Sequence, residues 1–123
     1  MADTNKHTMR RYPGGGIRDT SDGKPQYEGC LSPVVLRRFA EYMLAHTTQA
    51  DGETRSADNW QRGMDRDDYM DSLVRHVIEA WLVHRGNPGV DIEESLCAVL
   101  FNAQGYLFEK MVDEQRAARP ARA

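Results

Sequence analysis

An all-α fold, a small helical bundle, is predicted by three features of the sequence. Apolar residues recur at helical spacing over three segments, near residues 33–46, 68–85 and 92–112. Ser32-Pro33 provides a capping serine and a proline that suits the first helical position, and Gly86-Asn87-Pro88-Gly89 breaks the chain between the second and third segments. The glycine-rich stretch before the first helix has no hydrophobic period, so we predict irregular structure there.

Length sets the expected domain organisation. The chain has 123 residues and a mass of 14.0 kDa, which suits one domain with a modest core. We expect residues 1–13 to be a disordered lead, residues 14–112 to form the single helical domain, and residues 113–123 to be a frayed C-terminal tail.

The last predicted helix is apolar on two sides. One face is formed by Leu96, Val99, Leu100, Ala103 and Leu107, and the nearly opposite face by Ala98, Phe101, Gly105 and Phe108. A helix that is apolar on both sides is expected to be buried on both sides. With only about three helices available, we predict that the Phe101 face packs on another subunit, in a homodimer or a dimer of dimers.

Composition excludes several classes of function. The formal net charge is -3 and basic and acidic residues are interspersed, so we expect no nucleic-acid partner. No apolar run approaches the length of a membrane span, so we expect no membrane association. Cys30 and Cys97 lack the spacing of metal ligands and suit a reducing compartment, from which we predict a cytoplasmic protein.

Two segments could contact a ligand. Exposed amides of the glycine-rich stretch, with Arg18 and Lys24, could hold phosphate oxygens, although the stretch could equally be a mobile linker. Trp60 could stack on a base whose edge Asn59 contacts, or it could fill the end of the helical core.

Acidic and imidazole groups gather on the second and third predicted helices. His76 and Glu79 are three residues apart and share a helix face, with Arg75 further round, and Asp91 and Glu94 stand at the start of the next helix. Carboxylates from facing helices can hold one hard cation. Other roles are open: His76 as a half-buried, hydrogen-bonded histidine, and Asp91-x-x-Glu94 as a capping box. Asn102 could be a buried polar bridge or a nucleotide ligand.

An ordered set of short motifs carries a resemblance over about residues 14–108. The motifs are Gly15-Gly16-Ile17-Arg18, Asp22-Gly23-Lys24-Pro25, Leu31-Ser32-Pro33, Asp58-Asn59-Trp60, Arg75-His76 and Asp91-Ile92-Glu93-Glu94-Ser95-Leu96, followed by Asn102. In this order they resemble the phage-associated dATP/dGTP diphosphohydrolase N-terminal domain family, itself similar to the all-α nucleoside triphosphate pyrophosphohydrolases of the MazG type. The MazG-type signature, Glu-x-x-Glu followed by Glu-x-x-Asp, reads His76-x-x-Glu79 and Glu94-x-x-Cys97 here.

The resemblance implies a Mg²⁺-dependent hydrolase, with Mn²⁺ as a second possible ion, that splits a purine deoxynucleoside triphosphate into the monophosphate and pyrophosphate. Glu79, Asp91 and Glu94 are the candidate metal ligands. Cys97 stands where the signature has a carboxylate, and because a thiol is a poor ligand for Mg²⁺, Asp91 would serve as the ligand in its place. His76 would be a further metal ligand or the group that orients the attacking water, and His76 and Glu79 are the candidate catalytic residues. Arg18, Lys24 and Arg75 would contact phosphates, and Asn59, Trp60 and Asn102 the nucleoside. The alternative is a non-catalytic helical oligomer that binds or sequesters a nucleotide.

Overall fold

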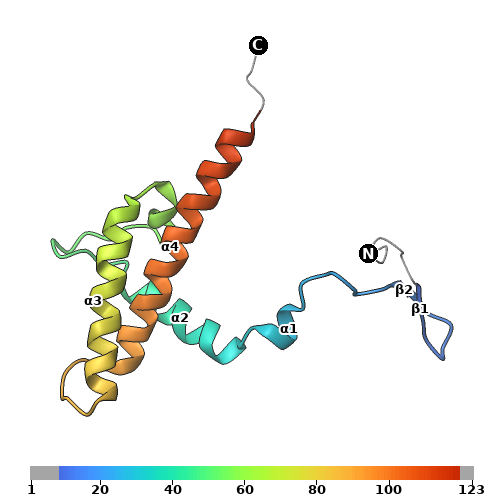
Figure 1. The fold of residues 1–123 in the computed structure, drawn as a ribbon, viewed down its shortest axis with the longest axis horizontal. Coiled ribbons are helices and arrows are strands. Elements are labelled where there is room, and N and C mark those ends of the chain that lie inside the picture. The colour runs from blue at the N-terminus through green and yellow to red at the C-terminus, as the bar shows by residue number, and fades with distance from the viewer. Residues whose placement is uncertain (1–8, 120–123) are drawn as a thin grey trace. The chain divides into compact units, whose positions relative to one another are not determined.

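The computed structural model describes residues 9–119, and the chain forms two compact units. The first unit ends at Ser32 and the second begins at Pro33, and each is described by itself. The first contains strands β1 (Met9–Arg11) and β2 (Ile17–Asp19) and the short helix α1 (Tyr27–Cys30). The second contains α2 (Pro33–Ala45), the 3₁₀ helix η1 (Asn59–Arg62), α3 (Arg66–His84) and α4 (Ile92–Ala118) (Figure 1). Within residues 9–119, no helix is both long enough and apolar enough to cross a membrane.

The N-terminal unit contains a β-hairpin where we predicted irregular structure. β1 and β2 pair antiparallel with Arg10 opposite Arg18. The turn is closed by the Tyr12 amide, which donates to the Gly16 carbonyl at 2.9 Å, and Gly15 adopts a φ of 93° that favours glycine. The glycines therefore build a turn rather than a loose loop. Residues 9–13 of the predicted lead belong to this hairpin, and residues 1–8 lie outside the described residues.

The helical unit confirms the all-α fold and the three principal helices. α2 begins at Pro33, as the Ser32-Pro33 pair predicts. The Asp65 side chain caps α3 by accepting from the Asp67 amide at 2.9 Å, and Asp91 caps α4 in the same way through the Glu93 amide at 2.9 Å. Aspartate caps thus fix the starts of both long helices.

α4 continues to Ala118, beyond the predicted end near residue 112, so residues 113–118 of the predicted frayed tail are helical. Asp113 pairs with Arg66 of α3 at 3.3 Å, and Lys110 pairs with Glu114 one turn along the helix. These ion pairs favour the extra turns, which we missed because the tail has no apolar period. Residues 120–123 lie outside the described residues.

α3 and α4 lie side by side in close contact (Figure 1). The buried residues between and around them are mostly small or polar: Tyr69 and Ala80 on α3, and Ser95, Cys97, Ala98, Asn102 and Gly105 on α4. Gly105 has no Cβ, and one placed there would overlap the Tyr69 ring. The face of α4 that carries these small residues therefore packs against other parts of the same chain.

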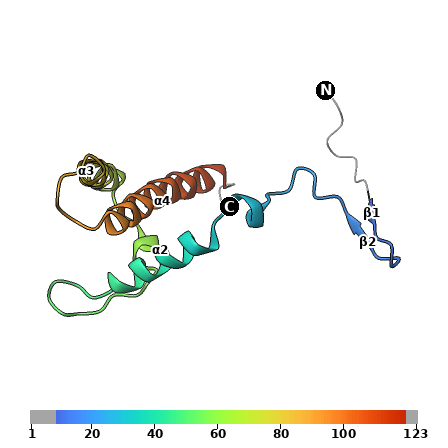
Figure 2. The same cartoon turned by 90° about the horizontal axis from the view of Figure 1, so that it is seen from below.

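This packing corrects our assignment of the Phe101 face to another subunit. Ala98 is 2% exposed and belongs to a core cluster with Tyr42 and Cys97, against which Phe39, Met43 and Phe101 pack. α2 supplies Phe39, Tyr42 and Met43, and it lies beside α4 in Figure 2. The face that stays exposed is the other one, with Leu96 at 49%, Leu100 at 42% and Leu107 at 56%.

The close contact at Gly105 gives a first prediction. Gly105→Ala should destabilise the fold by about 1–3 kcal/mol, because a methyl group forces the Tyr69 ring or α3 to move. Gly89→Ala is the matched control, since nothing lies within 4 Å of a Cβ built at that position. Urea unfolding should show a lower midpoint for Gly105→Ala alone. Equal midpoints for the two variants would contradict the described contact.

Candidate functional site

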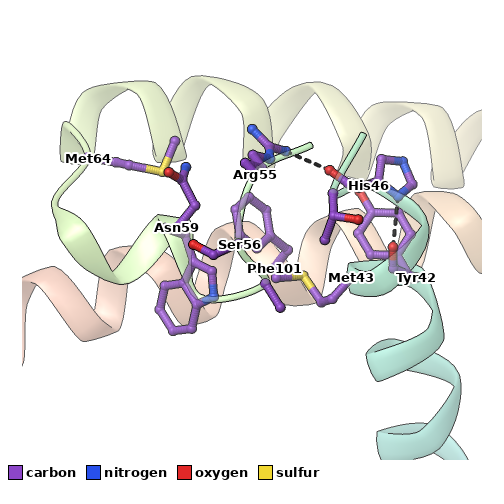
Figure 3. A pocket seen from close by; sticks show the side chains of 11 residues that line it. Tyr42, Met43, His46, Arg55, Ser56, Asn59, Met64 and Phe101 are labelled. Carbon is purple, nitrogen blue, oxygen red and sulfur yellow. Dashed lines mark hydrogen bonds between the residues drawn. The ribbon is translucent and has the colours of Figure 1, made fainter. Parts of the chain in front are cut away.

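A cavity of about 110 Å³ lies in the helical unit between the end of α2, the following connection, η1 and α4. Figure 3 shows the side chains around it. It is lined by Tyr42, Met43, His46, Thr47, Arg55, Ser56, Ala57, Asn59, Trp60, Met64 and Phe101. The cavity thus includes both residues that we predicted to face a base, Asn59 and Trp60.

The apolar wall of the cavity is held in place by aromatic contacts. The Trp60 ring meets Phe101 edge-on, with centroids 6.4 Å apart and an interplanar angle of 87°, and it meets Phe108 at 5.0 Å and 71°. Tyr69 of α3 contacts the same Phe101 ring at 5.8 Å. Trp60 therefore fills the end of the core, one of its two predicted roles, while another part of it lines the cavity.

The polar groups of the cavity have defined hydrogen-bonding states. His46 Nδ1 lies 2.8 Å from the Tyr42 carbonyl oxygen, which can only accept, so Nδ1 carries the proton and Nε2 of the neutral ring is an acceptor. Arg55 Nη2 donates to the His46 carbonyl at 3.0 Å. In the described part of the chain, the Asn59 side-chain amide has no hydrogen-bond partner, so it offers both donors and an acceptor.

This arrangement suits one planar heteroaromatic ring. Aromatic and sulfur-containing side chains contact the faces or edges of such a ring, while the Asn59 amide and His46 Nε2 can bond its polar edge. Arg55 and His46 are exposed whereas Asn59 and Trp60 are half-buried, so a chemical group attached to the ring would pass Arg55 and His46 on its way to solvent.

A second group of polar residues lies on α3. His76 Nδ1 donates to Glu79 Oε2 at 2.9 Å, and the two side chains are 28% and 34% exposed. The carboxylate fixes the ring orientation and leaves Nε2 as the acceptor of the neutral imidazole. Arg75 instead contacts its own helix, with Nη2 3.0 Å from Ser72 Oγ and Nη1 3.7 Å from Asp71 Oδ2. None of these residues lines the cavity.

The start of α4 is tied to α2 by one arginine. Arg38 Nε lies 2.9 Å from Glu93 Oε1, and Arg38 Nη2 lies 3.0 Å from Glu94 Oε1. Hydrogen bonds to Glu94 and Glu93 raise the pKa of Arg38, so this guanidinium stays charged. Only half of the predicted capping box forms, because Asp91 caps the helix while Glu94 bonds to Arg38.

The metal ion implied by the resemblance does not fit these residues as they are arranged. In residues 9–119, no group of three or more His, Cys, Asp or Glu side chains is placed to hold a metal ion. Glu79, Asp91 and Glu94 each have another partner: His76, the Glu93 amide and Arg38. Oxygen ligands are the right kind for Mg²⁺, but these three are not gathered around one point.

The other predicted ligand residues lie outside the cavity. Asn102 is 4% exposed, and its Nδ2 donates to the Ala98 carbonyl of its own helix at 2.8 Å. Arg18 lies in β2 and Lys24 follows a turn closed by its amide and the Ser21 carbonyl at 3.0 Å, both in the N-terminal unit.

Sequence reasoning missed Tyr42, His46 and Arg55 as cavity residues. Tyr42 and His46 are one helical turn apart, and their rings lie 4.1 Å apart between centroids. Their four-residue spacing could have indicated that the two rings share a helix face. The sequence gives no such indication for Arg55, because its position depends on how the 46–58 connection folds.

No protein-family model, curated protein or solved structure matches this chain. The resemblance drawn from the ordered motifs therefore remains a prediction.

The two cysteines should differ sharply in reactivity. Burial raises the pKa of the Cys97 thiol, whereas Cys30 is exposed. Because the thiolate is the reactive form, Cys97 should be largely protonated and shielded near pH 8. Titration with a chromogenic disulfide reagent should therefore modify one thiol per native chain and a second only after unfolding. Rapid modification of both thiols in the folded protein would contradict the packing of Cys97 between α2 and α4.

Proposed function

We propose that this protein binds a purine deoxynucleoside triphosphate, with the base in the cavity at η1. The observation that carries the proposal is the cavity itself, because an aromatic wall and the Asn59 amide, which has no hydrogen-bond partner among residues 9–119, line the same space of about 110 Å³. An asparagine amide can pair with a base edge through a donor and an acceptor at once, as it does with adenine. The base would lie in the cavity, and the sugar and phosphates would extend from it toward solvent.

A positively charged side chain, Arg55, supports a phosphate chain that extends from the cavity toward solvent. Arg55 lines the cavity and is exposed, and its guanidinium donates from Nη2 to the His46 carbonyl. The guanidinium of an arginine can donate two hydrogen bonds to the oxygens of one phosphate. Arg55 could make such a contact with a triphosphate that extends out of the cavity. The purine preference and the deoxyribose come from the resemblance to dATP/dGTP diphosphohydrolases.

Asn59→Ala tests base recognition. It should weaken binding of dATP or dGTP about tenfold, since one or two hydrogen bonds to the base are lost, each contributing about 0.5–1.5 kcal/mol. Isothermal titration calorimetry with the four deoxynucleoside triphosphates measures this. Gln61→Ala is the control, because Gln61 belongs to the same short helix but does not line the cavity.

Equal affinity in wild type and Asn59→Ala would overturn the placement of the base. Absence of binding by wild type to every nucleotide would overturn the proposed function as a whole.

Hydrolysis of the bound nucleotide is a second candidate function, favoured by the His76–Glu79 pair. With Nδ1 held by Glu79, the free Nε2 of a neutral His76 can accept a proton from water, as a general base must. Water would add to the α-phosphorus and pyrophosphate would leave, giving the deoxynucleoside monophosphate. No step of this proposal is assigned to a bound metal ion, because the described carboxylates are not arranged to hold one.

Product analysis separates the two candidates. Each deoxynucleoside triphosphate is incubated with the protein and either Mg²⁺ or Mn²⁺, and products are identified by chromatography. Monophosphate plus pyrophosphate from wild type, lost in Glu79→Gln while nucleotide affinity is kept, supports hydrolysis. Tight binding without turnover leaves the protein as a nucleotide-binding oligomer, the alternative function. Turnover that is unchanged in Glu79→Gln would exclude this pair from catalysis.

A further inference from the structure

An open groove of about 440 Å³ lies at the C-terminal end of α3. Its walls are formed by Ile78, Trp81 and Leu82, which are 48%, 56% and 50% exposed, and its polar lining residues are Arg85 and Asn87. The four residues from α3 and its C-cap follow the i, i+3, i+4, i+7 spacing and therefore share one side of the helix. None of the five residues lines the cavity at η1, so the groove is a separate site.

The way α3 ends gives this groove a fixed shape. Gly86 has a φ of 90°, a left-handed conformation that glycine adopts without strain. The Gly86 amide donates to the Val83 carbonyl at 2.9 Å and the Asn87 amide to the Leu82 carbonyl at 3.0 Å, which is the hydrogen-bond pattern of a Schellman motif. Asn87 Nδ2 donates to the same Leu82 carbonyl at 3.2 Å. These hydrogen bonds hold Asn87 against the last turn of α3, so a ligand would meet a preorganised surface.

Arg85 brings an unpaired positive charge to the groove. Its guanidinium carbon lies 5.5 Å from the centroid of the Trp81 ring, which is within cation–π distance. The arginines that pair with carboxylates in residues 9–119 are Arg37, Arg38, Arg66, Arg75 and Arg116. In the same part of the chain, the Arg85 guanidinium has neither a carboxylate partner nor a hydrogen-bond acceptor. The indole ring therefore holds this cation at the groove while its N–H donors stay available.

We propose that the groove binds a small aromatic carboxylate. The walls leave apolar surface that a planar ring can cover, and such a ring packs on the Trp81 indole in an offset or edge-to-face arrangement. The unpaired Arg85 guanidinium matches a carboxylate, because two of its N–H groups can donate side by side to the two carboxylate oxygens. The groove also has the size of small-molecule sites, which span roughly 300–1,000 Å³.

A small molecule suits this groove better than a protein partner does. Covering the exposed parts of Ile78 and Leu82 removes about 50 Å² of apolar surface each, and covering Trp81 removes about 100 Å². The total of about 200 Å² is far below the ~800 Å² that each partner contributes to a stable protein interface. A sugar or a phosphate chain is a poor match as well, because most of the lining is apolar.

The test follows the two tryptophans of the full chain by NMR. Each tryptophan gives one indole N–H signal in a ¹⁵N–¹H spectrum, and Trp81→Phe identifies the Trp81 signal by removing it. Titration with 2-naphthoate should shift the Trp81 signal to saturation, with a Kd of roughly 0.1–1 mM for a ligand of this size. The Trp60 signal should stay in place, because Trp60 lines the other cavity.

A neutral compound with the same ring system, 2-naphthamide, measures the contribution of the charge. It should bind wild type about threefold to tenfold more weakly than 2-naphthoate does, since the charge-assisted hydrogen bonds are lost at an exposed site. Arg85→Gln should bind the two compounds equally. Arg37→Gln is the matched control and should keep the wild-type preference, because Arg37 is an exposed arginine on α2 that pairs with Glu41 at 3.4 Å.

Equal binding of the two compounds by wild type would overturn the proposal. So would a shift of the Trp60 signal alone, or the lack of a saturable Trp81 shift up to about 10 mM, roughly ten times the weakest expected Kd. Sedimentation velocity checks for another occupant: an oligomer that Arg85→Gln dissociates would assign the groove to another copy of the chain and overturn the proposal too. Circular dichroism checks that each variant is helical. If Arg85→Gln fails to fold, Arg85→Met replaces it, because methionine keeps an apolar stem at this position and lacks the charge.

Discussion

The structure of the helical unit depends on how closely α3 and α4 approach each other. Gly105 leaves room for the Tyr69 ring, and Ala80 and Ala98 are small residues buried in the same region. Short side chains let two helix axes come together, and the larger side chains of both helices then remain on the outside. The close contact thus decides which face of α4 becomes core and which face stays exposed.

The same contact positions the cavity. Phe101 lies against Tyr69 of α3 on one side and against Trp60 of η1 on the other. Since Trp60 is held edge-on by Phe101 and Phe108, the preceding Asn59 is fixed beside the cavity although it belongs to a short 3₁₀ helix. The site is therefore built on the rigid part of the chain, while its polar rim, His46 and Arg55, comes from the end of α2 and the connection after it.

The fold could be predicted further than the site. Caps and breakers placed the starts of the long helices within a few residues, because Ser32-Pro33, Asp91 and the Gly86–Gly89 turn act locally, whereas α4 continues past its predicted end. Periodicity showed two apolar faces on α4 but could not tell which one lies inside, since that depends on side-chain size at the contact with α3. The hairpin was missed because each strand has only three residues and no apolar alternation to detect. Arg55 and Arg38 were missed as partners because pairs distant in sequence leave no local spacing signal.

The start of α4 shows why carboxylate spacing alone is a weak guide to metal binding. Glu79, Asp91 and Glu94 suggested a cation site by their spacing, yet Asp91 caps its helix, Glu94 bonds to Arg38 and Glu79 bonds to His76. A divalent ion at Glu94 would have to displace a guanidinium that bridges two carboxylates and also joins α2 to α4. Metal binding there would therefore be coupled to the docking of α2. Since Tyr42, Met43 and His46 of α2 line the cavity, it would also be coupled to the proposed nucleotide site.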